Sequence, residues 1–146
     1  AIYMSLGDIH YNRRDYERAA DEYKTVIQYS PRNPRAQLQL GLSYEYRAAA
    51  RSELLREASQ AEGEASTSQA PQQTLDELAA GREALEREVI ELRDLAIDSL
   101  AKTVALGSEA GTRARVELEK LYRQKNEDSL EGLEELIEEK KSELGR

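Results

Sequence analysis

The pattern of apolar and polar positions predicts helices along most of the chain. Between residues 2 and 12, apolar side chains recur every three or four residues, which places them on one face of a helix. A second apolar face covers residues 16–27, and Asp15 just before it is a suitable N-cap. Pro31 and Pro34 end the second helix. This stretch is therefore expected to form a pair of antiparallel helices.

Gly7 lies in the middle of the first predicted helix, where glycine is unfavourable. A glycine in that position costs about 1 kcal/mol relative to alanine. We expect that a second helix passes so close to Gly7 that no side chain fits there. Leu40 and Gly41 follow Leu6 and Gly7 after 34 residues, and self-similarity at a fixed period is typical of stacked helical repeats.

The first helix pair carries a recognisable motif. The motif has the form LG-x8-Y-x2-A-x3-Y-x7-P and consists of Leu6, Gly7, Tyr16, Ala19, Tyr23 and Pro31. It resembles the tetratricopeptide repeat (TPR), with His10 and Arg14 where that family usually has tyrosine and glycine. The resemblance implies helix pairs that stack into a right-handed superhelix with a groove for protein segments.

The second copy of the motif begins at Arg35 and is then interrupted. Helix-forming residues continue to about Gly63, well past the position where the first repeat turns. The polar segment EASTSQAPQQ, broken by Pro71, is expected to form a loop. Thr74 and Glu77 after it have the spacing of a capping box for another long helix.

Ala96 and Leu100 match the alanine and the last tyrosine of the first repeat, so the long helix rejoins the repeat there. The inserted residues form two arms of nearly equal length, as an antiparallel hairpin requires. We therefore predict a coiled-coil-like hairpin over about residues 47–90, with a flexible tip at about residues 64–73. Arg82 lies in its seam, where a strong coiled coil has an apolar residue.

A third, degenerate helix pair is expected over residues 108–146. Asp128 and Glu131 have the spacing of a cap for its second helix, whose charged residues are expected to face water and cap the array. The predicted fold is thus an all-α, TPR-like right-handed helical solenoid of three antiparallel helix pairs, the middle pair elongated into a hairpin. It is one domain, with repeats at 1–34, 35–107 and 108–146.

Composition excludes several classes of function. A net charge of -8 and a pI near 4.9 disfavour nucleic-acid binding, because phosphates attract clustered lysine and arginine. The chain has no cysteine, which excludes disulfides and thiolate metal sites. No apolar run approaches the length of about 18 residues that a membrane helix needs, so direct membrane insertion is not expected.

The sequence shows no constellation for catalysis, metal binding or cofactor binding. His10 is the only histidine, and it stands where the repeat has a packing aromatic residue. The eight glycines form no phosphate-binding loop. The glutamates near the C-terminus alternate with leucines, as on a solvated helix face. We therefore expect no enzyme, no metal site and no cofactor.

The resemblance to the family implies that the first helix of each pair lines a peptide-binding groove. Met4 and Asp8 stand where the family's carboxylate clamp has lysine and asparagine, so we expect no such clamp. Tyrosines, amides and charges of both signs in the groove suit a protein segment. The predicted groove residues are Ser5, Asp8, Tyr11, Asn12, Arg35, Gln39, Leu42, Glu45, Tyr46, Arg113, Glu117, Lys120, Arg123 and Gln124.

The expected function is a non-catalytic scaffold for protein–protein interaction, with a protein or peptide as its partner. The alternative is a homo-oligomer or assembly module that acts through the inserted hairpin or through uncovered solenoid ends. A third interpretation is that the groove residues only solvate the surface. The sequence predicts neither the partner nor the localisation.

Overall fold

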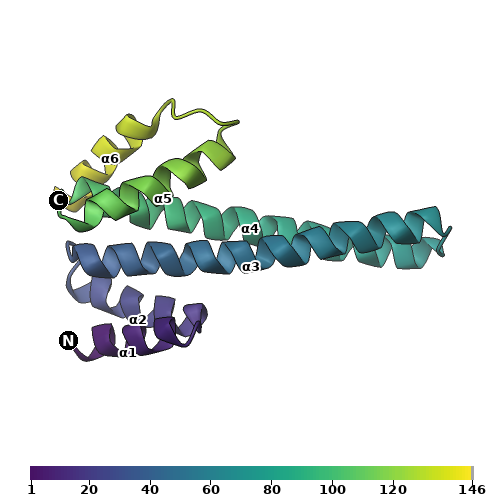
Figure 1. Cartoon of the computed structure of the whole chain (residues 1–146), viewed down its shortest axis with the longest axis horizontal. Coiled ribbons are helices and arrows are strands. Elements are labelled where there is room, and N and C mark those ends of the chain that lie inside the picture. The colour runs from purple at the N-terminus through teal and green to yellow at the C-terminus, as the bar shows by residue number, and fades with distance from the viewer. Residues whose placement is uncertain (146) are drawn as a thin grey trace.

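The computed structural model describes residues 1–145, which form six α-helices and no strand. The predicted all-α fold class is confirmed. The long hairpin of α3 and α4 lies between the first pair, α1 and α2, and the two C-terminal helices (Figure 1). The helices are α1 (Ile2–Asn12), α2 (Tyr16–Tyr29), α3 (Pro34–Thr67), α4 (Gln72–Ala105), α5 (Ala110–Lys125) and α6 (Leu133–Gly145).

The turn between α1 and α2 is closed by backbone hydrogen bonds and by a side-chain cap. Asp15 caps α2 as predicted, because its carboxylate accepts a hydrogen bond from the backbone N–H of Arg18 at 3.3 Å. Arg14 has a φ of 61°, the left-handed conformation that usually follows a helix end. The N–H groups of Arg14 and Asp15 donate to the carbonyls of Tyr11 and His10 at 2.9 Å. This pattern is a Schellman motif, formed here without glycine.

The two recurring glycines mark close helix crossings. A Cβ atom on Gly7 would lie 2.5 Å from Cε1 of Tyr23, and one on Gly41 would lie 2.8 Å from Cγ of Leu100. Tyr23 and Leu100 are both fully buried. The predicted close approach at Gly7 is confirmed, and Leu100 occupies the place in the second pair that Tyr23 has in the first.

The tip of the hairpin is tighter than predicted. α3 continues to Thr67 and α4 begins at Gln72, so the turn covers only residues 68–71. The predicted capping box at Thr74 is wrong, because this residue lies inside the first turn of α4 and the helix has no side-chain cap. Pro71 precedes the helix with a φ of -56°, a backbone conformation already suited to helix entry.

Arg82 is accommodated in the hairpin seam by ion pairs. Its Nε lies 2.5 Å from Oε2 of Glu62 on the opposite arm, and its Nη1 lies 2.8 Å from Oε1 of Glu86. The side chain of Arg82 is one-quarter exposed, at 25%. A charged residue in the seam therefore links the two arms instead of leaving an unpaired charge between them.

The third helix pair differs from the prediction. α5 packs on α4 and α3, whereas α6 packs on α4 and diverges from α5 (Figure 1). The predicted cap formed by Asp128 and Glu131 is wrong, because α6 begins only at Leu133. Glu127 and Asp128 have φ values of 51° and 68°, and residues in this left-handed conformation cannot start a helix.

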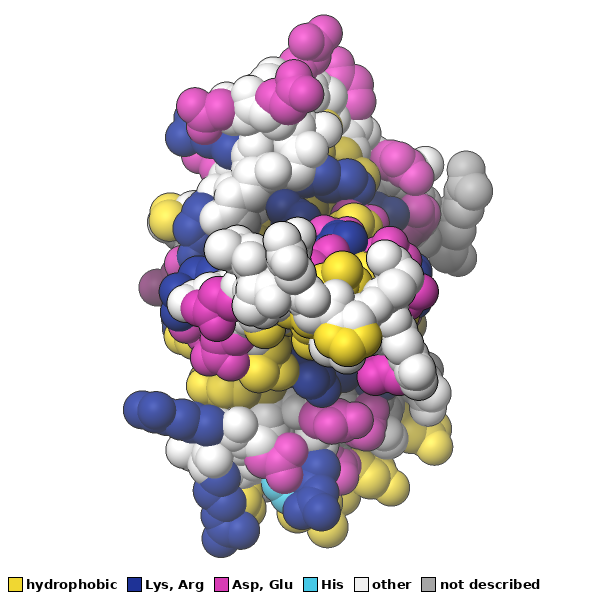
Figure 2. Space-filling view, turned by 90° about the vertical axis from the view of Figure 1, so that its right-hand side faces the viewer, with side chains coloured by type: hydrophobic (Ala, Val, Ile, Leu, Met, Phe, Trp, Pro, Cys, Tyr) yellow, Lys and Arg dark blue, Asp and Glu magenta, His cyan; other side chains and the backbone are white. Residues whose placement is uncertain are grey.

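The core runs through the base of the hairpin, and the outer face of α1 is uncovered. Ile2 is 68% exposed, Leu6 36% and Ile9 46%. Figure 2 shows hydrophobic side chains at the end of the molecule where α1 lies. Within residues 1–145, no helix is long and apolar enough to cross a membrane. The large core residues include Tyr23, Leu40, Leu42, Tyr44, Leu92, Ile97, Leu100, Leu118, Leu121, Leu133 and Ile137.

Candidate protein-binding surface

A polar network joins α1, α2 and α3 on the predicted surface. The hydroxyl of Tyr23 donates to Asp8 at 2.9 Å and accepts a hydrogen bond from the amide of Gln39 at 3.3 Å. Arg35 forms an ion pair with the same carboxylate. Burial and the hydrogen bond to Asp8 raise the pKa of Tyr23, so the hydroxyl stays protonated as the donor. Three predicted residues, Asp8, Arg35 and Gln39, are thus fixed to one another.

Three tyrosines from three helices pack together next to this network. The ring of Tyr11 lies edge-on to Tyr16 and Tyr46, with centroid distances of 5.3 Å and 6.1 Å. Tyr16 and Tyr46 stack at 4.8 Å, and Tyr46 is still 44% exposed. Burial, with a smaller contribution from Tyr46, raises the pKa of Tyr11 to about 12, while the positive charge of Arg113 on α5 opposes this shift. The predicted residues Tyr11, Tyr46 and Arg113 therefore lie near one another.

A cluster of two carboxylates and one ammonium group connects α3 with α5. Lys120 Nζ lies 2.5 Å from Oε1 of Glu45 and 2.6 Å from Oε2 of Glu117. Burial, followed by the hydrogen bond with Glu117, raises the pKa of Glu45 to about 7. The same hydrogen bond and that of Lys120 lower the pKa of Glu117. As the pH falls through neutral, Glu45 is therefore the first of the two carboxylates to take up a proton.

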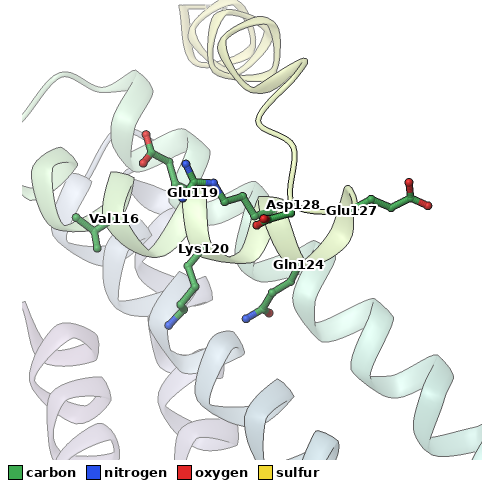
Figure 3. A pocket seen from close by; sticks show the side chains of 7 residues that line it. Val116, Glu119, Lys120, Gln124, Glu127 and Asp128 are labelled. Carbon is green, nitrogen blue, oxygen red and sulfur yellow. The ribbon is translucent and has the colours of Figure 1, made fainter.

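Two clefts lie beside α5. One has a volume of about 510 Å³, and Glu45, Lys120 and Gln124 line it together with the base of the hairpin. The other, of about 730 Å³, adds Arg123 and the start of the following loop. Figure 3 shows Lys120 and Gln124 extending from one side of α5 and Glu119 extending from the opposite side. The clefts thus contain predicted residues of the second and third repeats.

The structure separates one predicted residue from the others. Leu42 is 2% exposed and belongs to the core, so it is not part of the surface. Tyr16 was not among the predicted groove residues. The sequence signal that could have indicated it is its position directly after the turn that follows Tyr11. Among residues 1–145, no group of three or more His, Asp and Glu side chains could hold a metal ion. Five of the predicted residues have exposed side chains and form no ion pair or hydrogen-bond network described above: Ser5, Asn12, Arg113, Arg123 and Gln124.

Replacing Glu45 by glutamine is expected to stabilise the protein at pH 8 by about 1 kcal/mol and to have little effect at pH 5. The folded pKa of Glu45, about 7, lies above its usual value of 4.5. Its contribution to stability is therefore fully present below pH 4.5 and is lost as the pH rises through 7. Glutamine removes this loss, because it stays neutral.

Urea unfolding of both proteins at the two pH values measures this effect. Glu91→Gln, on the exposed surface of α4, is the matched control and is expected to change stability equally at both pH values. A gain for Glu45→Gln that is the same at pH 5 and pH 8 would show that its carboxylate is not protonated in the folded protein.

Comparison with protein-family models gives a match to one segment of the chain. Residues 7–45 match the family model described as a TPR repeat. The matched segment contains the Gly7 crossing, the tyrosine Tyr11 and the carboxylate of Glu45. TPR repeats generally mediate protein–protein interaction. Searches of curated proteins and of solved structures gave no significant match.

Proposed function

Starting from the TPR repeat at residues 7–45, we propose that the surface formed by α1, α3 and α5 binds a segment of another protein. The observation that carries this proposal is the tyrosine cluster, in which Tyr46 is 44% exposed although Tyr16 holds its ring in place. A rigid, exposed aromatic side chain offers a large contact area and loses little conformational entropy on binding. The proposed role is non-catalytic.

Charges on both sides of the tyrosine cluster support a partner with mixed polar and apolar character. Arg35 and Asp8 lie on the side of α1, whereas Arg113, Lys120 and Glu117 lie on the side of α5. Exposed charges at the rim of an interface contribute mainly to the association rate and to specificity. An extended segment with an apolar side chain against Tyr46 and charged residues towards both rims would fit this surface.

The double variant Tyr46→Ala, Arg123→Glu is expected to weaken binding of the partner by at least about 30-fold, the effect of losing a central aromatic residue. Partners are captured from a lysate on the immobilised chain and identified by mass spectrometry. The affinity of the leading partner is then measured with the wild type and the variant. The melting temperature should fall only slightly, because Arg123 is exposed and Tyr46, which is 44% exposed, loses only its ring contacts with Tyr11 and Tyr16.

The matched control is Tyr29→Ala, Arg87→Glu, which also removes an exposed tyrosine and reverses an arginine. Tyr29 is 80% exposed at the end of α2, and Arg87 is exposed on the hairpin. This control is expected to bind the partner as the wild type does. Equal losses for the two double variants would place the binding site elsewhere on the molecule.

A further inference from the structure

A largely exposed stripe of residues follows one side of α3 along the hairpin. Successive members are three or four positions apart, which is the spacing of a helix–helix seam. Five of the six residues are exposed, and Leu54 is 41% exposed. We call this set the α3 stripe, and its members are Arg47, Ala50, Leu54, Glu57, Ala61 and Glu64.

The α3 stripe is distinct from the side of α3 that faces α4. The positions that face the other arm are half-buried, among them Leu55 and Glu62, and Glu62 forms the ion pair with Arg82 of α4. Leu54, Glu57, Ala61 and Glu64 of the stripe each directly precede one of these half-buried positions. The stripe therefore has the pattern of a second seam on the same helix. Its outer part, from Leu54 to Glu64, is exposed, whereas its base lies beside the α1–α2 turn.

The arginines of the hairpin lie towards its base, and its tip carries only acidic charges. At its base, Arg47 and Arg51 lie in a cleft of about 380 Å³ between α3 and the α1–α2 turn, which Arg14, Asp15 and Glu17 also line. Arg51 is paired with Glu88 of α4 at 3.0 Å. Figure 2, seen from the tip, shows basic, acidic and hydrophobic side chains below the hairpin on the side of α1 and α2. Residues 57–81 around the tip carry five acidic residues and no lysine or arginine. The tip is thus acidic, whereas the base carries charges of both signs, with Arg47 as the basic member of the α3 stripe.

We propose that two copies of the chain pair in antiparallel orientation through the α3 stripe. When Arg47 lies opposite Glu64 of the second copy, Ala50 lies opposite Ala61 and Leu54 opposite Glu57, since each pair is centred between residues 55 and 56. Two-fold symmetry repeats every contact. The small alanines let the helices approach closely, and the aliphatic part of Glu57 covers Leu54.

Charge complementarity favours a second copy of the chain as the partner and an antiparallel orientation of the two α3 helices. Arg47 and Glu64 are about 26 Å apart along α3, and this distance is the same in both copies, so both ends pair at once. A parallel arrangement would place Arg47 beside Arg47 and Glu64 beside Glu64. The net charge of -8 on each copy is screened beyond about 10 Å at 0.1 M salt, whereas the paired charges are close.

Disulfide cross-linking tests the orientation, because the chain has no cysteine of its own. The double variant Ala50→Cys, Ala61→Cys is expected to form a covalent dimer on mild oxidation. Within one chain the two cysteines are about 16 Å apart along the helix, too far for an internal disulfide. Ala50→Cys alone is the matched control and should remain monomeric on a non-reducing gel. A monomeric double variant, or equal cross-linking of the single variant, overturns the proposed pairing.

Charge reversal tests the Arg47 to Glu64 contact in the full chain. By sedimentation equilibrium at 0.1 M salt, the mass of the wild type should rise with concentration from 16.5 kDa towards twice that value. Arg47→Glu is expected to weaken this association at least about tenfold, and adding Glu64→Arg to it should restore it. Arg87→Glu makes the same change in net charge on α4 and should have no effect.

Two results would overturn the proposal. One is a wild type that is monomeric at every concentration. The other is a dimer that persists in Arg47→Glu, which would locate self-association on another surface, such as the uncovered apolar face of α1. These outcomes do not bear on the protein-binding surface, because the measurements use no partner protein. Melting temperatures of the variants confirm that each one is folded.

Discussion

Gly41→Leu is expected to lower the free energy of unfolding by about 3 kcal/mol, because the crossing of α3 and α4 has no space for a side chain. A Cβ atom at this position would lie 2.8 Å from Cγ, 2.9 Å from Cδ2 and 3.3 Å from the backbone nitrogen of Leu100. Leu100 is fully buried and cannot move aside. The helices themselves would have to separate at the base of the hairpin.

Gly81→Leu is a matched control for this substitution. Gly81 also lies within a long helix, but a Cβ atom there would meet nothing within 4 Å. Because leucine favours helix more than glycine does, the control is expected to be neutral or stabilising by up to about 1 kcal/mol. Urea unfolding followed by circular dichroism measures both variants. A similar result for the two glycines would show that the crossing at Gly41 tolerates a side chain.

The same crossings explain why the arrangement of the first two helix pairs could be predicted from the sequence. A glycine inside a helix is a specific signal, because it is unfavourable unless another helix passes close by. The equivalence of Gly7 with Gly41, and of Tyr23 with Leu100, fixed the register of both pairs. The structure confirms both crossings, and it also shows the long hairpin between them.

The ends of the helices could not be predicted in the same way. A capping box is a short pattern that also occurs inside helices, as Thr74 shows. The backbone conformation determines where a helix starts. Pro71 has a φ that suits the start of α4, and the left-handed residues Glu127 and Asp128 shift the start of α6 to Leu133. Such conformations depend on the surrounding packing more than on residue type.

The candidate surface was predicted in part. Tyr11 and Tyr46 come from the first helices of successive pairs and are 35 residues apart, one more than the 34-residue period, and their ring centroids lie 6.1 Å apart. Leu42 was misplaced because α3 is the central helix and is covered by α2, α4 and α5, so nearly its whole circumference is buried near residue 42. A pattern derived from one helix pair does not contain this crowding.

Helix α6 packs on α4 through the buried side chains of Leu133 and Ile137, and an ion-pair cluster on α4 adds to this attachment. Lys140 is 9% exposed, and its Nζ lies 2.8 Å from Oδ1 of Asp98 and 3.0 Å from Oε1 of Glu143. Burial of Asp98 opposes its ionisation, but hydrogen bonds from Lys102 and Lys140 hold its pKa below the usual value. The ionised carboxylate therefore stabilises the docked position of α6.

Asp98→Ala is expected to weaken the docking of α6 by about 2 kcal/mol, less than for a fully buried pair because the Asp98 side chain is 38% exposed. Hydrogen exchange of the backbone amides in residues 133–145 should become about 30-fold faster. Because the folded pKa of Asp98 is lowered, the wild type should lose this stabilisation as the pH falls below about 4, and the variant should show no such loss.

Asp94→Ala separates this effect from a general loss of stability. Asp94 lies one turn earlier on α4 and pairs with Lys125 of α5 at 2.8 Å, so its removal should leave the exchange of α6 unchanged. If both variants accelerate exchange in every helix equally, α6 unfolds only together with the whole molecule. If Asp98→Ala accelerates hydrogen exchange only in α6, this helix detaches from α4 without unfolding of the other helices. Such local opening is expected because α6 packs on α4 and is not packed closely against α5.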